Sequence, residues 1–276
     1  MVSCRRARRA RASSEGSIEV LYPIEIKANI GGNVGDALAA LGDPSPATKR
    51  VVWFAEDRSG IVAGKLNLLS RGIILRVRSG EDDDSTAKLR PVDSAHLTPP
   101  WADPFTEPPL KYRIEGDWSG DRHVVAASAE ASHEQASLSE AVHDSRFDQI
   151  FGPQQRRLVR DGAHIAVEVG QLVALGPIDS TKWQDLTMGG VNNVDAERWA
   201  VADLDFLERS VRVKPEDDET AAHYGARTEQ AQQNLLSAIA ELKLELDTNA
   251  ESKTQRVLAA LAASIQRTGT DSREAS

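Results

Sequence analysis

The sequence predicts an α+β fold in which hairpin-connected strands form a sheet and helices cover one of its faces. Several segments alternate apolar and charged residues with the period of two that a half-buried strand requires. The C-terminal part instead repeats leucine and isoleucine at spacings of three and four, which is typical of amphipathic helices. A length of 276 residues suits either two domains or one large β-barrel.

The first expected strand lies around residues 24–29, because Ile24, Ile26 and Ala28 alternate with polar residues. Glycines end this strand, and a short helix follows around 34–41. Alternating runs predict further strands at 50–54, 73–78, 86–90, 112–118 and 123–128. The turn residues at 117–121 indicate a hairpin, and the acidic run at 81–84 a solvated loop tip. The proline-rich stretch at 99–109 excludes regular structure.

The second half of the chain predicts more helix. Residues 131–159 are expected to be mostly helical, with a break at Gly152-Pro153. Strands are expected around 166–174, 197–201 and 206–214. Leu235, Ile239, Leu242 and Leu246 predict one amphipathic helix, and a second is expected around 258–265.

Composition and charge set the domain organisation and exclude several classes. Residues 1–17 are rich in Arg, Ala and Ser and predict a disordered basic tail. A tunnel or barrel domain is expected at 18–214, helices packing on it at 215–268, and a second disordered tail at 269–276. Cys4 cannot form an intrachain disulfide, which fits a reducing cytoplasm. No apolar run reaches the roughly 20 residues of a membrane span, and a net charge of -9 argues against a general nucleic-acid binder. Oligomeric state stays open.

The charged residues of the strands carry the functional prediction. Arg76-Val77-Arg78 and Lys88-Leu89-Arg90 each place two cations on one face of a strand. Other strands carry acids on one face, such as Glu115 with Asp117. These charged faces are either the solvent-exposed side of an ordinary sheet or, if the sheet curls into a barrel, the lining of the barrel interior. Cation pairs on some strands and acid pairs on others favour the interior, where phosphate and Mg²⁺ or Mn²⁺ would supply the counter-charges.

The order of these motifs resembles the CYTH superfamily, the triphosphate tunnel metalloenzymes, in a bacterial branch. The matching segments are 23–27 (Pro-Ile-Glu-Ile-Lys), 53–57, 66–68, 72–78, 86–91, 112–117, 175–178 with Lys182, 196–199, 206–210 and 252–256. The resemblance spans residues 18–266. It implies an antiparallel eight-stranded β tunnel with surrounding helices and a C-terminal helical segment.

The resemblance also implies roles for particular residues. Triphosphate would be bound by Arg76, Arg78, Lys88, Arg90 and Lys182, and the metal by Glu25, Glu208, Glu115, Asp117 and Glu197. Lys27 would be catalytic, because it would neutralise charge that develops on the transferred phosphoryl or its leaving group. The expected function is a metal-dependent phosphohydrolase acting on inorganic triphosphate, polyphosphate or a triphosphorylated small molecule.

Two departures from the family pattern keep other functions open. Pro23 stands where the family signature has its first Glu, and Ser210 where many relatives carry a second acid after Glu208. Fewer oxygen ligands weaken a magnesium site. The alternatives are therefore a class IV-type adenylyl cyclase that makes cyclic AMP from ATP, and a non-catalytic protein that binds polyphosphate or nucleotides. The six histidines show no metal-type pairing, and Gly31-Gly32-Asn33 indicates a turn before a helix.

Overall fold

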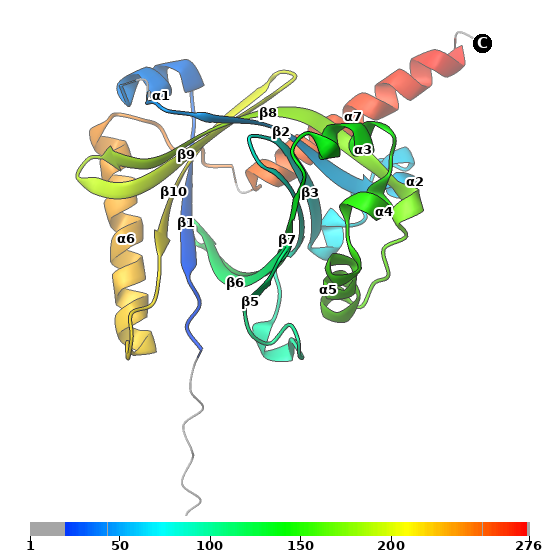
Figure 1. Cartoon of the computed structure of the whole chain (residues 1–276). Coiled ribbons are helices and arrows are strands. Elements are labelled where there is room, and N and C mark those ends of the chain that lie inside the picture. Colours follow the sequence, from blue (N-terminus) through cyan, green and yellow to red (C-terminus); the bar gives the residue numbers. More distant parts are fainter. Residues whose placement is uncertain (1–19, 43, 250, 275–276) are drawn as a thin grey trace, which may run out of the picture.

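The computed structural model describes residues 20–42, 44–249 and 251–274, and its centre is a closed β-barrel (Figure 1). The expected N-terminal tail lies outside the described residues. The strands are β1 (Ile24–Ile30), β2 (Thr48–Asp57), β3 (Ile73–Gly80), β4 (Asp83–Leu89), β5 (Phe105–Glu107), β6 (Leu110–Ser119), β7 (Arg122–His133), β8 (Leu172–Met188), β9 (Val191–Val201) and β10 (Leu204–Val213).

The ring runs β1-β10-β9-β8-β2-β3-β4-β7-β6 and closes where β6 pairs with β1. Among the described residues it has 9 strands, and β5 pairs with β6 outside it. The expected tunnel fold with surrounding helices is confirmed, in a form with one strand more than the eight that the resemblance implied. The closing pair β1–β6 is parallel, whereas the other pairs of the ring are antiparallel.

The closure depends on a close approach at Gly116. A Cβ atom at this position would lie 2.6 Å from Cγ1 of Ile24. The absence of a side chain lets β6 come near enough for the Gly116 amide to donate to the carbonyl of Pro23, at 2.8 Å. A glycine inside a strand often marks such an approach of two backbones. The barrel therefore closes at a residue without a side chain.

The helices cover the outside of the barrel and one of its ends. They are α1 (Val34–Ala40), α2 (Arg58–Val62), α3 (Ser137–His143), α4 (Phe147–Ile150), α5 (Pro153–Ala163), α6 (Ala221–Glu241) and α7 (Lys253–Glu274), with short 3₁₀ turns at Leu69–Arg71, Ser94–His96 and Val169–Gln171. Helices α3 to α5 pack on β3, β4, β6 and β7, and α1 and α6 pack on β1, β8, β9 and β10. The apolar faces of these strands therefore point outward.

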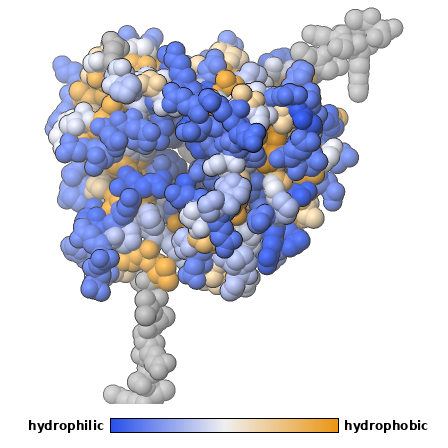
Figure 2. Space-filling model, viewed as in Figure 1, coloured by the Kyte–Doolittle hydropathy of each residue, from blue (hydrophilic) through white to orange (hydrophobic). Residues whose placement is uncertain are grey.

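Helix α7 packs at one end of the tunnel. Val257, Leu258 and Ala262 form an apolar cluster with Phe54 and Trp199, whose strands belong to the ring. Hydrophilic residues dominate the face of the molecule drawn in Figure 2. No described helix has the length and apolar character that a membrane crossing requires.

Several expected elements differ from the structure. The acidic run at 81–84 is not wholly a solvated tip, because Asp83 and Asp84 are buried in β4. Asp83 accepts hydrogen bonds from the amides of Gly80 and Leu138, and so joins the β3–β4 turn to the start of α3. The carboxylate of Asp84 pairs with Arg78. Partners from distant parts of the chain thus compensate for burial that the local pattern does not predict.

The boundaries of other elements differ as well. Strand β8 begins at Leu172 rather than near 166, and it continues through Gly176-Pro177, well beyond the expected end at 174. A shift in the β2–β8 register lies at this place and accommodates the proline within the strand. Residues 105–107 form short β5 within the proline-rich stretch, and 131–133 extend β7 instead of starting a helix. Helix α7 reaches Glu274, beyond the expected end at 268.

Candidate functional site

A cavity of about 390 Å³ lies inside the barrel, and every site residue predicted from the sequence lines it. These are Glu25, Lys27, Arg76, Arg78, Lys88, Arg90, Glu115, Asp117, Lys182, Glu197 and Glu208. They come from β1, β3, β4, β6, β8, β9 and β10, except Arg90, which directly follows β4. The charged faces of these strands turn toward the tunnel. The interior is therefore the place where the opposing charges meet, as the strand patterns predicted.

Basic side chains outnumber acidic ones in the lining of this tunnel. The sequence prediction did not include Arg50, Arg113, Arg122, Arg212, Glu130 and Lys253, which also line it. Arg212 lies two and four residues after Ser210 and Glu208, so strand alternation alone could have placed it on their face. The cations gather in a chain whose net charge is -9, and such a local excess indicates an anionic ligand.

Asp117 is the centre of one charge network in the tunnel. Its Oδ2 atom lies 2.9 Å from Nζ of Lys27, 2.9 Å from Nη1 of Arg90 and 3.5 Å from Nζ of Lys88. The side chain is 2% exposed. Burial would raise the pKa of Asp117, but the three surrounding cations outweigh it and hold the pKa well below its usual value. The carboxylate stays ionised and keeps these cations in place.

Glu25 and Glu115 extend this network along the tunnel wall. Glu25 lies 2.9 Å from Nζ of Lys27, and Glu115 lies 3.1 Å from Nζ of Lys88. Burial opposes ionisation of Glu25, yet the attraction of Lys27 and Lys88 lowers its pKa to about 2. Two of the carboxylates predicted to bind metal are thus paired with lysines: Glu25 with Lys27 of the same strand, and Glu115 of β6 with Lys88 of β4.

Arg78 and Arg76 differ in how their charges are balanced. The Nε atom of Arg78 lies 2.8 Å from Asp84, and its Nη2 lies 3.2 Å from Glu130, which also accepts from Arg113. Within the part of the chain that the structure describes, Arg76 has no ion pair. It donates to the hydroxyl of Thr86 at 3.2 Å, while its Nε has no partner.

The environment of Arg76 makes it a candidate contact for an anion. Burial, together with repulsion from Arg78, lowers the pKa of Arg76 to about 10. A charged group that is buried without a counter-ion costs free energy, and an anionic ligand would remove that cost. Gly72 helps to position this strand: it has φ of +73°, and a Cβ there would lie 2.9 Å from the carbonyl oxygen of Arg90.

A second group of charges lies where α7 meets the tunnel. Nζ of Lys253 lies 3.0 Å from Glu197 and 3.3 Å from Glu208. Glu197 also accepts a hydrogen bond from the hydroxyl of Ser180, at 3.0 Å. Lys182 lies nearer the solvent and pairs with Asp195, at 2.8 Å. The segment 252–256 was part of the resemblance, but no strand pattern assigns Lys253 to the tunnel, because the residue belongs to a helix that lies far from these strands in the chain.

The oxygen donors of the tunnel fit a divalent cation at one place. Glu197 and Glu208 both reach a single position, the one where the ammonium of Lys253 stands. Among the described residues, no three His, Cys, Asp or Glu side chains gather into a ready-made site. Two carboxylates can nevertheless hold Mg²⁺ when water and phosphate oxygens complete the octahedron. Glu25, Glu115 and Asp117 lie among lysines and arginines instead, so their metal-binding roles stay predictions.

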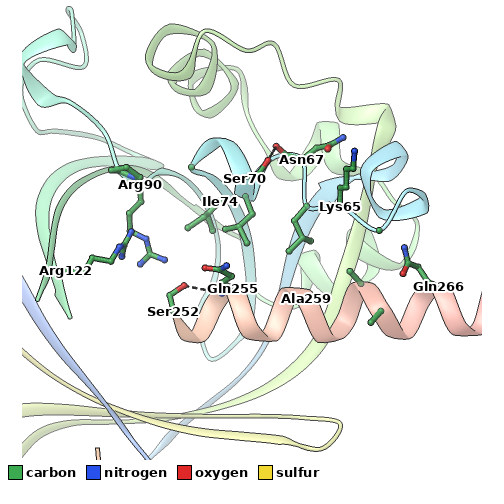
Figure 3. Close-up of a pocket in the computed structure, with 17 residues that line it drawn as sticks. Lys65, Asn67, Ser70, Ile74, Arg90, Arg122, Ser252, Gln255, Ala259 and Gln266 are labelled. Carbon is green, nitrogen blue, oxygen red and sulfur yellow. Dashed lines mark hydrogen bonds between the residues drawn. The ribbon is translucent and has the colours of Figure 1, made fainter. Parts of the chain in front are cut away.

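A second pocket of about 650 Å³ adjoins the tunnel and is drawn in Figure 3. Ile74, Arg90, Arg122 and Ser252 line both cavities. One wall is the face of α7 that carries Gln255 and Ala259, and the segment 64–72 forms the opposite wall. This pocket is lined by more apolar groups than the tunnel, including Leu66, Leu69 and three alanines of α7.

Two solved structures share this architecture. One is a candidate adenylyl cyclase from Hippeastrum that is described as having a dominant triphosphatase activity. The match covers 90% of this chain and 96% of that chain, with 14% identity and a TM-score of 0.53. A candidate adenylate cyclase from Bacillus halodurans matches over 85% of this chain and 96% of its own, with 12% identity and a TM-score of 0.53. This protein has the same tunnel fold as these two structures. Neither a protein-family model nor a curated protein matches its sequence.

Proposed function

We propose that this protein binds the triphosphate group of its substrate inside the tunnel and hydrolyses it with the help of Mg²⁺ or Mn²⁺. The observation that carries the proposal is the excess of partly buried basic side chains that line the cavity of the barrel, where Arg76 has no acidic partner among the described residues. The dominant triphosphatase activity described for the Hippeastrum protein, and the naming of both neighbours as candidate adenylyl cyclases, support the same class of ligand. Membership of the bacterial branch of the CYTH superfamily is part of this proposal.

The tunnel residues would divide the work of binding and charge neutralisation. Arg76, Arg78, Lys88, Arg90 and Lys182 would contact phosphate oxygens, and the arginines can make bidentate contacts. The ammonium of Lys27, fixed by Glu25 and Asp117, would neutralise the charge on the departing diphosphate. Water adds to the terminal phosphorus as the bond to the bridging oxygen breaks, which yields phosphate and diphosphate.

A metal held by Glu197, Glu208 and phosphate oxygens would supply a Lewis acid at the reacting phosphoryl group. The lysines and arginines around Glu25 and Asp117 keep those carboxylates ionised and oriented, and Lys88 positions Glu115. The enclosing barrel would limit access of bulk water to the phosphate chain.

The test is phosphate release from tripolyphosphate in the presence of Mg²⁺ or Mn²⁺. Arg76→Ala and Glu208→Ala are expected to lower kcat/KM by 100-fold or more, because each removes a charge that faces the substrate. Arg71→Ala, an exposed arginine at the end of a 3₁₀ turn, is the matched control and is expected to keep wild-type activity. A folded wild-type protein that releases no phosphate from any triphosphate would remove the hydrolase proposal.

Two observations each favour an alternative function. The second pocket gives a nucleoside room beside the tunnel, which favours an adenylyl cyclase that uses ATP. Cyclic AMP formation would identify this activity. Pro23 and Ser210, in the positions of two expected acids, favour a polyphosphate-binding protein without turnover. In that case ligand raises the melting temperature without product, and Pro23→Glu is expected to create activity.

A further inference from the structure

Lys253 enters the tunnel from a helix rather than from a strand. Its ammonium contacts Glu197 at 3.0 Å and Glu208 at 3.3 Å, and it lies 4.1 Å from the centre of the Trp199 ring. The residue is 5% exposed. Two carboxylates and an aromatic face therefore hold one buried positive charge.

The backbone fixes the two carboxylates side by side. Glu197 and Glu208 are direct partners in the antiparallel register of β9 and β10. Two acids placed in this way repel one another unless a cation stands between them, and the ammonium of Lys253 meets that need. The same two carboxylates form the place in the tunnel where a divalent cation fits. The ammonium of Lys253 occupies this position, at 3.0 Å from Glu197 and 3.3 Å from Glu208, so a divalent cation can bind both carboxylates there only after the ammonium has moved away.

We propose that the ammonium of Lys253 and a divalent cation exclude one another at the Glu197–Glu208 pair. Without ligand, Lys253 neutralises the two acids. When a metal–triphosphate complex enters, the metal takes the carboxylates, and the released ammonium becomes available to the phosphate chain. The inference rests on the proposed function and assigns to Lys253 the control of metal uptake.

The packing of α7 limits the movement that this exchange needs. Ser252, Lys253 and Thr254 line the tunnel, whereas Val257 and Leu258 lie in the apolar cluster at its end. The long side chain of Lys253 and the first turn of the helix can therefore move while the rest of α7 stays packed. The exchange requires no change in the barrel.

The experiment measures Mn²⁺ binding to the full-length protein by calorimetry, without phosphate. Lys253→Met removes the competing charge and is expected to tighten Mn²⁺ binding tenfold or more. Lys253→Arg keeps a charge and is expected to keep the weak binding of the wild type. Lys49→Met, an exposed lysine on β2 outside both cavities, is the matched control for loss of one positive charge. Equal Mn²⁺ affinity in wild type and Lys253→Met would overturn the proposal.

Two further variants localise the effect and guard against misfolding. The double variant Lys253→Met with Glu197→Gln is expected to lose the gain, because one of the two carboxylates is neutral; retention of the full gain would contradict the assigned site. If Lys253→Met does not fold without metal, Lys253→Gln replaces it, since its amide can still donate to a carboxylate. The same tenfold gain is expected, and its absence overturns the exchange.

Tripolyphosphate binding in metal-free buffer separates this inference from the proposed function. Binding by the wild type, together with unchanged Mn²⁺ affinity in the Lys253 variants, would retain the phosphate tunnel and reject the exchange. If no variant binds tripolyphosphate with or without Mn²⁺, the proposed function fails, while the Mn²⁺ titrations still decide whether Lys253 competes for the acids.

Discussion

Replacing Asp117 by Asn is expected to destabilise the free protein and to strengthen its binding of anions. The substitution keeps the shape of the side chain but removes the negative charge that contacts Lys27 and Arg90 at 2.9 Å and Lys88 at 3.5 Å. Removing one partner from a buried ion pair costs about 3–5 kcal/mol. Because the Asn oxygen can still accept one hydrogen bond, we expect a loss of about 3 kcal/mol in the free energy of unfolding.

The assay is urea denaturation in metal-free buffer, with and without tripolyphosphate. The variant leaves its cations without an internal counter-charge, so the ligand should stabilise it more than it stabilises the wild type. Ligand stabilisation grows with the ratio of ligand concentration to Kd, and the difference between the two proteins reports the change in affinity. Asp205→Asn is the control, because Asp205 pairs with Arg198 at the surface, where both side chains are 38% exposed.

For this exposed pair we expect a loss of about 1 kcal/mol or less. If Asp117→Asn costs no more than Asp205→Asn, water screens the charges of the tunnel and they do not depend on one another. If the variant is destabilised but gains nothing from tripolyphosphate, the cations hold the barrel together without serving an anion. Either result would refute the reasoning from this charge network.

Three further predictions concern pH, barrel closure and the second pocket. The folded protein lowers the pKa of Glu25 to about 2, so this carboxylate stabilises the fold above about pH 5. That stabilisation is lost as the pH falls toward 2, and thermal melts between about pH 5 and 2 would measure the loss. Gly116→Ala is expected to cost about 1–3 kcal/mol, because its Cβ would meet Ile24. Gly170→Ala, whose Cβ would meet nothing within 4 Å, is the control and should be nearly neutral in urea denaturation. Ala259→Trp should fill the second pocket and lower the affinity for ATP but not for tripolyphosphate, as measured by calorimetry. Glu229→Trp, on the exposed face of α6, is the control. An equal loss of affinity for both ligands would contradict separate subsites.

The strand patterns predicted the tunnel lining better than they predicted the ends of the elements. A side chain on a strand points to one of two faces, so alternation placed Arg76 with Arg78 and Lys88 with Arg90, and the register of β3 and β4 put both pairs on the same side. The limits of β8 were harder to predict, because a glycine–proline pair within it is typical of a turn. The pairing of β8 with β2 and β9 overrides this local preference.

The sequence by itself determined which residues carry charge on which face, and it did so because alternation with period two is a local property of a strand. Only the tertiary structure decided that those faces line an interior, since closure depends on the contact of β1 with β6 at Gly116. It also decided the partners of each charge. Lys253 reaches Glu197 and Glu208 because α7 packs against the end of the barrel, and no local pattern around residue 253 contains that information.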